Sequence, residues 1–119
     1  MATDSAQQKT GAAAESLAAE YLTARGLRII ERNFRVRGGE IDLIANDKGT
    51  LVFVEVRLRS RNDFGGAGAS ITFTKQQRII LAARHYLQIH GERDCRFDCI
   101  LLNGLNIDTI EWITGAFSS

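Results

Sequence analysis

Residues 39–58 read GEIDLIANDKGTLVFVEVRL, and this stretch predicts the centre of the fold. Two apolar runs, 40–45 and 51–58, flank the turn-forming residues 46–49. Apolar runs joined by Asn, Asp and Gly are typical of an antiparallel hairpin. The turn is centred between positions 47 and 48, so the numbers of facing residues should sum to about 95–97.

A helix is predicted on each side of this hairpin. Over residues 11–25 the apolar side chains recur at helical spacing, and Gly26 ends the pattern. A second apolar stripe runs over residues 74–90, with Thr74 as its N-cap. Both helices are therefore expected to bury one face against the sheet.

The remaining segments complete a single α/β domain. Further strands are predicted at 27–36, 96–102 and 107–113, and a flexible glycine-rich loop at 60–70. The order of elements is α-β-β-β-α-β-β. We expect one domain over residues 10–117, preceded by a flexible N-terminal tail at 1–9 that lacks apolar periodicity.

Length and composition exclude several classes of protein. A chain of 119 residues with 45% hydrophobic and 24% charged side chains has the size and composition of one globular domain. No apolar run approaches the roughly 18 residues of a membrane helix, and no signal segment precedes the domain, so we expect a cytoplasmic protein without a membrane partner. Cys95 and Cys99 are too few for a disulfide framework and are interpreted as small apolar strand residues.

The charge distribution indicates a phosphate-containing partner. The net charge is only +1, but residues 25–61 carry nine Lys and Arg against five Asp and Glu, and eight of the nine are Arg. Arginine forms paired hydrogen bonds with phosphate better than lysine does. A solvated charged face is the commoner cause of such a cluster and stays an alternative.

Two carboxylates in the hairpin suggest a metal site. Asp42 and Glu55 have numbers that sum to 97, which places them opposite or nearly opposite each other. Carboxylates so close repel each other unless a cation lies between them. Hard oxygen ligands suit Mg²⁺ or Mn²⁺. Each acid taken alone is better explained by a surface ion pair with an arginine.

Glu15 adds a third carboxylate on the first predicted helix. At about 100° per residue it lies at the edge of the apolar stripe, close to the side that faces the sheet. Glu20 points well away from that stripe. Glu15 is therefore expected to lean over the sheet and Glu20 to face water.

These motifs resemble the YraN-like (UPF0102) family, small bacterial proteins described as predicted endonucleases and distantly similar to archaeal Holliday junction resolvases. The resemblance runs from Gly11 to about Trp112 and rests on GEIDLI at 39–44, FVEVR at 53–57 and RFD at 96–98. It implies a restriction-endonuclease-like fold of the PD-(D/E)XK type, in which a helix packs on a mixed central β-sheet flanked by helices.

The resemblance also implies roles for individual residues. Asp42 and Glu55 would bind Mg²⁺ or Mn²⁺, with the Val56 carbonyl as a third ligand from the same strand. Arg57 stands where the motif usually has a lysine, and Glu15 matches the acidic residue of the first helix. Gln76, or its neighbour Gln77, is a weaker candidate to orient a water at the metal.

Arg57 is the important departure from the motif. A desolvated lysine can lose its proton and act as a base, whereas arginine in effect cannot. Arg57 could still neutralise charge that grows on the scissile phosphate. The loss of a proton from the attacking water would then depend on the metal.

Two functions follow, and a third interpretation stays open. The first is a metal-dependent endonuclease that acts on branched or structured DNA, with a homodimer expected from the two-fold symmetry of a four-way junction. The second is a catalytically degenerate module that binds nucleic acid or a protein. In the third, the acids only form ion pairs with arginines. The expected phosphate-contacting residues are Arg35, Arg37, Arg59, Arg61 and Lys75.

Other polar residues carry weaker expectations. His85 and His90 are five residues apart, which is poor spacing for metal ligands on a helix, so a surface position is expected. Asp98 could act in catalysis, or it could form a structural contact with Arg96; the sequence favours neither.

Overall fold

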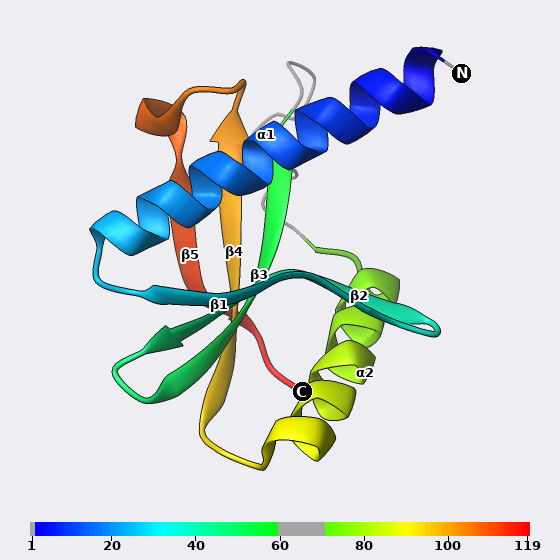
Figure 1. Ribbon diagram of the computed structural model, residues 1–119, viewed down its shortest axis with the longest axis vertical. Helices are drawn as coiled ribbons and strands as arrows, with labels where there is room; N and C mark the ends of the chain where they lie inside the picture. Colours follow the sequence, from blue (N-terminus) through cyan, green and yellow to red (C-terminus); the bar gives the residue numbers. More distant parts are fainter. Residues whose placement is uncertain (1, 60–70) are drawn as a thin grey trace.

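The computed structural model describes the backbone of residues 2–59 and 71–119, and the side chains of residues 11–59 and 71–119. Within this part of the chain, a mixed sheet of five strands lies between two α-helices (Figure 1). The architecture confirms the predicted α/β class and the predicted order of elements, and it is compatible with a restriction-endonuclease-like fold. The elements are α1 (Ala2–Ala24), β1 (Arg28–Val36), β2 (Gly39–Asp47), β3 (Thr50–Arg59), α2 (Phe73–His90), β4 (Cys95–Asn103) and β5 (Glu111–Phe117).

The strands follow one another across the sheet in chain order. Neighbouring strands are antiparallel except β3 and β4, which are parallel. A parallel pair needs a crossover connection, and α2 belongs to the connection here. The crossover brings the beginning of α2 back beside the end of β3, which matters for the site described below.

Side chains along the central strands alternate between two apolar layers. Phe53 of β3 packs in the layer beneath α2, whereas Val52 and Val54 pack beneath α1. The apolar stripes predicted for the two helices are buried against these layers. The buried stripe residues include Ala14, Ala18 and Leu22 of α1 and Ile79, Ile80, Ala83, Tyr86 and Leu87 of α2.

The hairpin of β2 and β3 has the register that its turn predicts. Leu43 pairs with Val54, and the same sum of 97 holds for the other pairs of this hairpin. Lys48 and Gly49 form the turn with φ angles of 52° and 97°. Two positive φ angles are typical of a type I′ turn, whose twist matches that of the strands it joins.

The ribbon formed by β1 and β2 changes faces at Asn33 and Asp42. Asn33 has a φ of 53°, in the left-handed region that non-glycine residues seldom adopt. Leu43 packs beneath α1, but Ile41, two residues earlier, packs beneath α2. In a regular strand residues two apart share a face, so the alternation breaks at Asp42. The break redirects the tip of the ribbon towards α2 (Figure 1).

Gly39 allows that tip to lie directly against α2. A Cβ atom at this position would collide with the backbone carbonyl oxygen of Arg78 and would lie 3.1 Å from the Ala82 amide nitrogen. Gly38, with a φ of 85°, makes the turn between β1 and β2. The two glycines therefore have different roles, one in the turn and one in helix packing.

The first helix begins earlier than predicted. It starts at Ala2 instead of Gly11, so residues 2–9 are helical where a flexible tail was expected. Alanine, glutamine and lysine favour helix without any apolar periodicity, which was the signal used to place its start. None of the described helices is long and apolar enough to cross a membrane.

Two other boundaries also differ from the prediction. The N-cap of α2 is Thr72 and not Thr74; its hydroxyl oxygen accepts a hydrogen bond from the Lys75 amide at 3.2 Å. The last strand begins at Glu111, because residues 107–109 form a short 3₁₀ turn whose cap is the Asn106 side chain. In both cases a short polar side chain bonded a nearby amide and fixed the local backbone.

Candidate active site

Asp42 lies where β2 and β3 stop pairing. The last pair of this ladder is Leu43 with Val54, and beyond it Oδ2 of Asp42 accepts a hydrogen bond from the Val56 amide at 2.8 Å. The carboxylate thus takes the place of a backbone partner. Because the N–H and C=O of one strand residue point to the same side, the Val56 carbonyl also faces this gap.

Glu55 is the neighbouring carboxylate on β3, and its side chain is 4% exposed. Its Oε1 forms an ion pair with Nζ of Lys75 at 2.9 Å. Lys75 is also one of the residues predicted to contact phosphate, and that prediction stays untested; the structure shows its contact with this acid. Asp42 and Glu55 lie just beyond the last pair of the hairpin, close enough for the charge of Glu55 to raise the pKa of Asp42, which agrees with the predicted closeness of the two acids.

The pKa values of the two acids are raised mainly by burial. Burial raises the pKa of Asp42 to about 7, and the charges of Glu55 and, to a smaller extent, Glu15 act in the same direction. Burial also raises the pKa of Glu55, while the ion pair with Lys75 opposes that shift. A carboxylate that is hard to ionise beside another acid favours binding of a further cation.

Glu15 faces the same region from α1. It lines a hollow of about 440 Å³ together with Asp42, Glu40, Asn33 and three further residues of α1 and β1. Its position agrees with the predicted lean towards the sheet, whereas Glu20 is exposed. Residues of three elements, α1, β1 and β2, therefore line the hollow beside Asp42.

Glu40 belongs to this region, although the sequence analysis did not single it out as a site residue. It lines both the hollow beside Asp42 and a second, smaller pocket beside Glu55. Its carboxylate forms ion pairs with Arg35 at 3.6 Å and with Arg78 at 4.0 Å. The available signal was its place two residues before Asp42 on a predicted strand.

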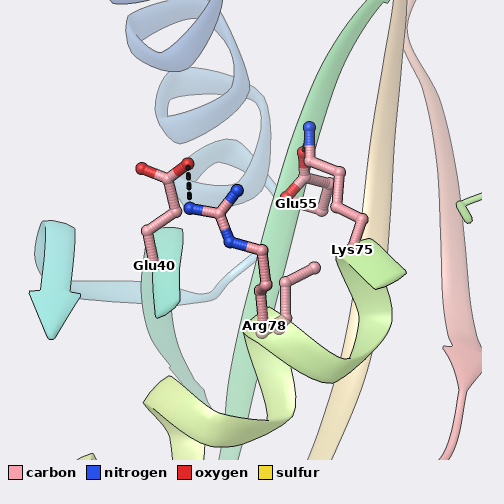
Figure 2. Close-up of a pocket in the computed structure, with 5 residues that line it drawn as sticks. Glu40, Glu55, Lys75 and Arg78 are labelled. Carbon is pink, nitrogen blue, oxygen red and sulfur yellow. Dashed lines mark ion pairs between the residues drawn. The ribbon is translucent and has the colours of Figure 1, made fainter. Parts of the chain in front are cut away.

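The second pocket joins β2 and β3 to α2. Figure 2 shows Lys75 and Arg78 on α2 facing Glu55 and Glu40 respectively. Residues three apart in a helix lie on one face, so one side of α2 presents two cations to two acids. The close approach of Gly39 to α2 holds this face in position.

The donor set fits a hard divalent cation that keeps several waters. Among the described residues, no three His, Cys, Asp or Glu side chains come together in a way that could hold one ion. Asp42, Glu55 and the Val56 carbonyl offer two carboxylates and one backbone oxygen. Magnesium is commonly held by one or two carboxylates together with water and substrate phosphate.

Arg57 and Gln76 flank this centre differently. The positive charge of Arg57, which is half-buried, helps to lower the pKa of Glu55, so the guanidinium lies within electrostatic range of that acid. The Gln76 side-chain amide donates a hydrogen bond to the Ile71 carbonyl at 2.8 Å, at the start of its own helix. This hydrogen bond occupies the Gln76 side-chain nitrogen.

The predicted phosphate-contacting arginines are spread over the surface. Arg35 and Arg37 lie exposed on and just after β1, and Arg35 borders the hollow beside Asp42. Arg59 lies at the end of β3 and pairs with Glu111 at 3.5 Å; its Nε atom is buried and has no hydrogen-bond partner among the described residues. Arg61 and the glycine-rich loop at 60–70 lie outside the described residues.

Asp98 has a structural environment. It is fully buried on β4 and accepts hydrogen bonds from Arg96, from the Trp112 indole and from the Gly115 amide. These bonds tie β5 to β4, which favours the structural alternative for the Arg96 contact. His85 and His90 are both exposed, and the ring of His90 packs 4.1 Å from that of Tyr86.

Comparisons with known proteins give a consistent result. The model of the uncharacterised protein family UPF0102 matches residues 14–102. A UPF0102 protein of Dechloromonas aromatica is 61% identical over 92% of this chain and 88% of its own length. UPF0102 proteins of Methylobacillus flagellatus and Nitrosomonas europaea are 54% and 53% identical, over 94% and 90% of this chain and 99% and 92% of their own lengths.

Proposed function

The chain belongs to the UPF0102 family, also known as the YraN-like family, and we propose that it is a metal-dependent endonuclease that hydrolyses phosphodiester bonds. The observation that carries this proposal is the closeness of Asp42 and Glu55 at the point where β2 and β3 separate. A half-buried and a buried acid beside the place where the ladder ends form a site that favours a divalent cation and, through it, a phosphate.

In this proposal Asp42 and Glu55 hold Mg²⁺ or Mn²⁺, with the Val56 carbonyl as a further ligand. A divalent cation bound there would neutralise charge on the scissile phosphate and lower the pKa of a nearby water. The hydrogen bond from the Val56 amide fixes the rotamer of Asp42. The acid therefore needs little reorganisation to bind the cation.

The surrounding residues supply positioning and charge. Glu15 faces the water shell of the cation from across the hollow that it shares with Asp42. Arg57, within electrostatic range of Glu55, stabilises negative charge that grows on the phosphate. Gln76 orients a water through its side-chain oxygen, since its nitrogen bonds the Ile71 carbonyl.

The substrate that we propose is branched or structured DNA. The exposed Arg35 and Arg37, with Arg59 and Arg61, would contact phosphates on either side of the cut. A homodimer would present two such sites to a four-way junction, whose own symmetry is two-fold. The resemblance to junction resolvases supports this choice.

Arg57 favours one second candidate, a module of the same fold that binds nucleic acid without cutting it. Because arginine keeps its proton, a site that needs a lysine base at this position would be inactive. Such a protein would still bind DNA through its arginines.

A cleavage assay separates the two functions. Labelled junction, flap and duplex DNA are incubated with Mg²⁺ or Mn²⁺ and with wild type, Asp42→Asn, or Glu20→Gln. Asp42→Asn should lower cleavage at least about 100-fold, since charge stabilisation dominates phosphoryl transfer. Glu20→Gln removes an exposed acid of α1 and should cleave like wild type.

Each outcome has a clear meaning. Equal cleavage by Asp42→Asn and wild type would overturn the assignment of the site. Tight binding by wild type without cleavage of any substrate would favour the non-cutting module.

A further inference from the structure

Lys75 occupies a position that helix energetics disfavour. It lies in the first turn of α2, where its amide bonds the N-cap Thr72 and no acidic residue is present. The N-terminal end of a helix carries partial positive charge, so a lysine there costs free energy. The ion pair with Glu55 at 2.9 Å accounts for its presence, because it offsets this cost.

The contact leaves Lys75 facing two environments. Its side chain is 47% exposed, although the acid it contacts is only 4% exposed. The pair uses Oε1 of Glu55, so the carboxylate has its other oxygen for a divalent cation. Figure 2 shows the lysine beside Glu55, one helical turn before Arg78. An ammonium here lies between a buried metal ligand and solvent, the side from which a substrate arrives.

We propose that Lys75 is a catalytic residue of this site, whose ammonium contacts the scissile phosphate beside Glu55 and stabilises its transition state. This inference rests on the proposed endonuclease function. In this proposal the lysine of the site comes from α2. The strand position two residues after Glu55, where the motif usually has a lysine, is occupied by Arg57. The chain thus places a compact ammonium in contact with this acid and a planar guanidinium within electrostatic range of it.

The chemistry is ordinary hydrolysis with Lys75 as a fixed charge. A bond forms between the oxygen of a water molecule and phosphorus, and the bond from phosphorus to the leaving sugar oxygen breaks. The water gives up one proton to solvent, and the leaving oxygen takes one from solvent. Lys75 keeps its proton throughout, and its charge offsets the charge that grows on the non-bridging oxygens.

This role differs from general phosphate contact, which the sequence predicted for Lys75. A residue that only binds the DNA backbone changes KM and the salt dependence of binding. A residue that acts in the transition state lowers kcat and leaves KM nearly unchanged. The two roles are therefore separable by kinetics.

The test compares Lys75→Gln, Lys75→Arg and Arg84→Gln with wild type. Glutamine removes the charge but can still donate a hydrogen bond to Glu55, which protects folding. Arginine keeps both the charge and the pair. Arg84 is exposed, and its place nine residues later in α2 puts it half a turn round the helix from Lys75, so it is a matched control. Thermal unfolding confirms that each variant is folded.

We expect Lys75→Gln to lower kcat about 100-fold or more with KM within about threefold of wild type. Lys75→Arg should recover most of that loss, and Arg84→Gln should match wild type. A kcat of Lys75→Gln within about threefold of wild type, or a loss confined to KM, would overturn the assignment of Lys75 alone. If wild type cleaves nothing while Asp42→Asn behaves identically, the endonuclease function itself is wrong, and the role of Lys75 falls with it.

Discussion

At Asp42, burial and the charge of Glu55 both oppose ionisation and raise the pKa of the side chain to about 7 from 3.8. Below the lower value the acid is protonated in the folded and unfolded chains alike. Between the two values only the folded chain holds the proton, so the free energy of unfolding falls as pH rises. Above about 7 the folded protein bears the full cost of the buried charge.

The variant Asp42→Asn should therefore be more stable than wild type at pH 8 in the absence of metal. Asparagine has no charge to bury, and its side-chain oxygen can still accept the hydrogen bond from Val56. The difference in melting temperature should shrink as pH falls through 7 towards 4. Thermal unfolding in EDTA at several pH values measures it.

Glu20→Gln is the control for this experiment, since it removes an exposed acid from α1. It should show no comparable gain at pH 8. An Asp42→Asn variant that melts below wild type at pH 8 would mean that the ionised carboxylate stabilises the fold, which contradicts the free-energy cost inferred from its raised pKa.

Whether the sequence could predict a contact between two residues depended on how far apart they lie in the chain. Asp42 and Glu55 belong to one hairpin with a short turn, so counting from the turn was enough to bring them together. The pairing of Lys75 with Glu55 depends on how the crossover returns α2 to β3, which no periodicity encodes. Glu40 was missed because its role depends on two arginines, of which Arg78 lies on α2.

At the scale of elements, the contact between α2 and the tip of β2 holds the second pocket in shape. Gly39→Ala should lower the free energy of unfolding by about 1–3 kcal/mol, because the added methyl group collides with the Arg78 carbonyl. The colliding atom belongs to the helix backbone, so a side-chain rotation cannot relieve it. Chemical denaturation measures the loss.

Gly11→Ala is the matched glycine substitution in α1. Its Cβ would meet nothing within 4 Å, and alanine in a helix interior is favoured over glycine by about 0.5–1 kcal/mol. It should therefore hold or raise stability. Equal stability of Gly39→Ala and wild type would mean that α2 does not press on the ribbon as described.

Element boundaries were predictable where a single signal marked them. The turn was predicted within one residue because Gly49 accepts a positive φ, although Lys48, which also has a positive φ, is a residue type that seldom adopts one. The start of α2 was predicted two residues too late. Thr72 and Thr74 are both suitable N-caps, and only the backbone conformation decides between them. The change of face at Asn33 and Asp42 left no mark in the local sequence pattern.

Across the whole molecule, the arginine cluster predicts how DNA affinity depends on salt. The logarithm of the association constant should fall linearly with the logarithm of salt concentration, because each phosphate contact releases counterions. Arg37→Ala, on the exposed turn after β1, should lower the slope by about 1, and Arg84→Ala should leave it unchanged. Fluorescence anisotropy without metal gives the slopes. Affinity that is absent at low salt, or that salt does not alter, would contradict the nucleic-acid partner.

The α/β class, the order of elements and the apolar stripes of the two helices followed from periodicity and glycine positions alone. The mixed character of the sheet came from family resemblance, because the parallel pairing of β3 with β4 joins segments far apart in the chain. The surface arginines that are available to bind phosphate were predicted only in part. The sequence shows which arginines are present, but not which of them form ion pairs with acids. Arg59, for example, is paired with Glu111 of β5.

The most direct test of the metal site is an anomalous difference map from crystals soaked in Mn²⁺. The account predicts a peak at about 2.0–2.2 Å from carboxylate oxygens of both Asp42 and Glu55, with the Val56 carbonyl in the same coordination shell. The same soak of Asp42→Asn crystals should lose that peak. Saturating Mn²⁺ with no peak between the two acids, or with a peak only elsewhere on the molecule, would contradict the central claim.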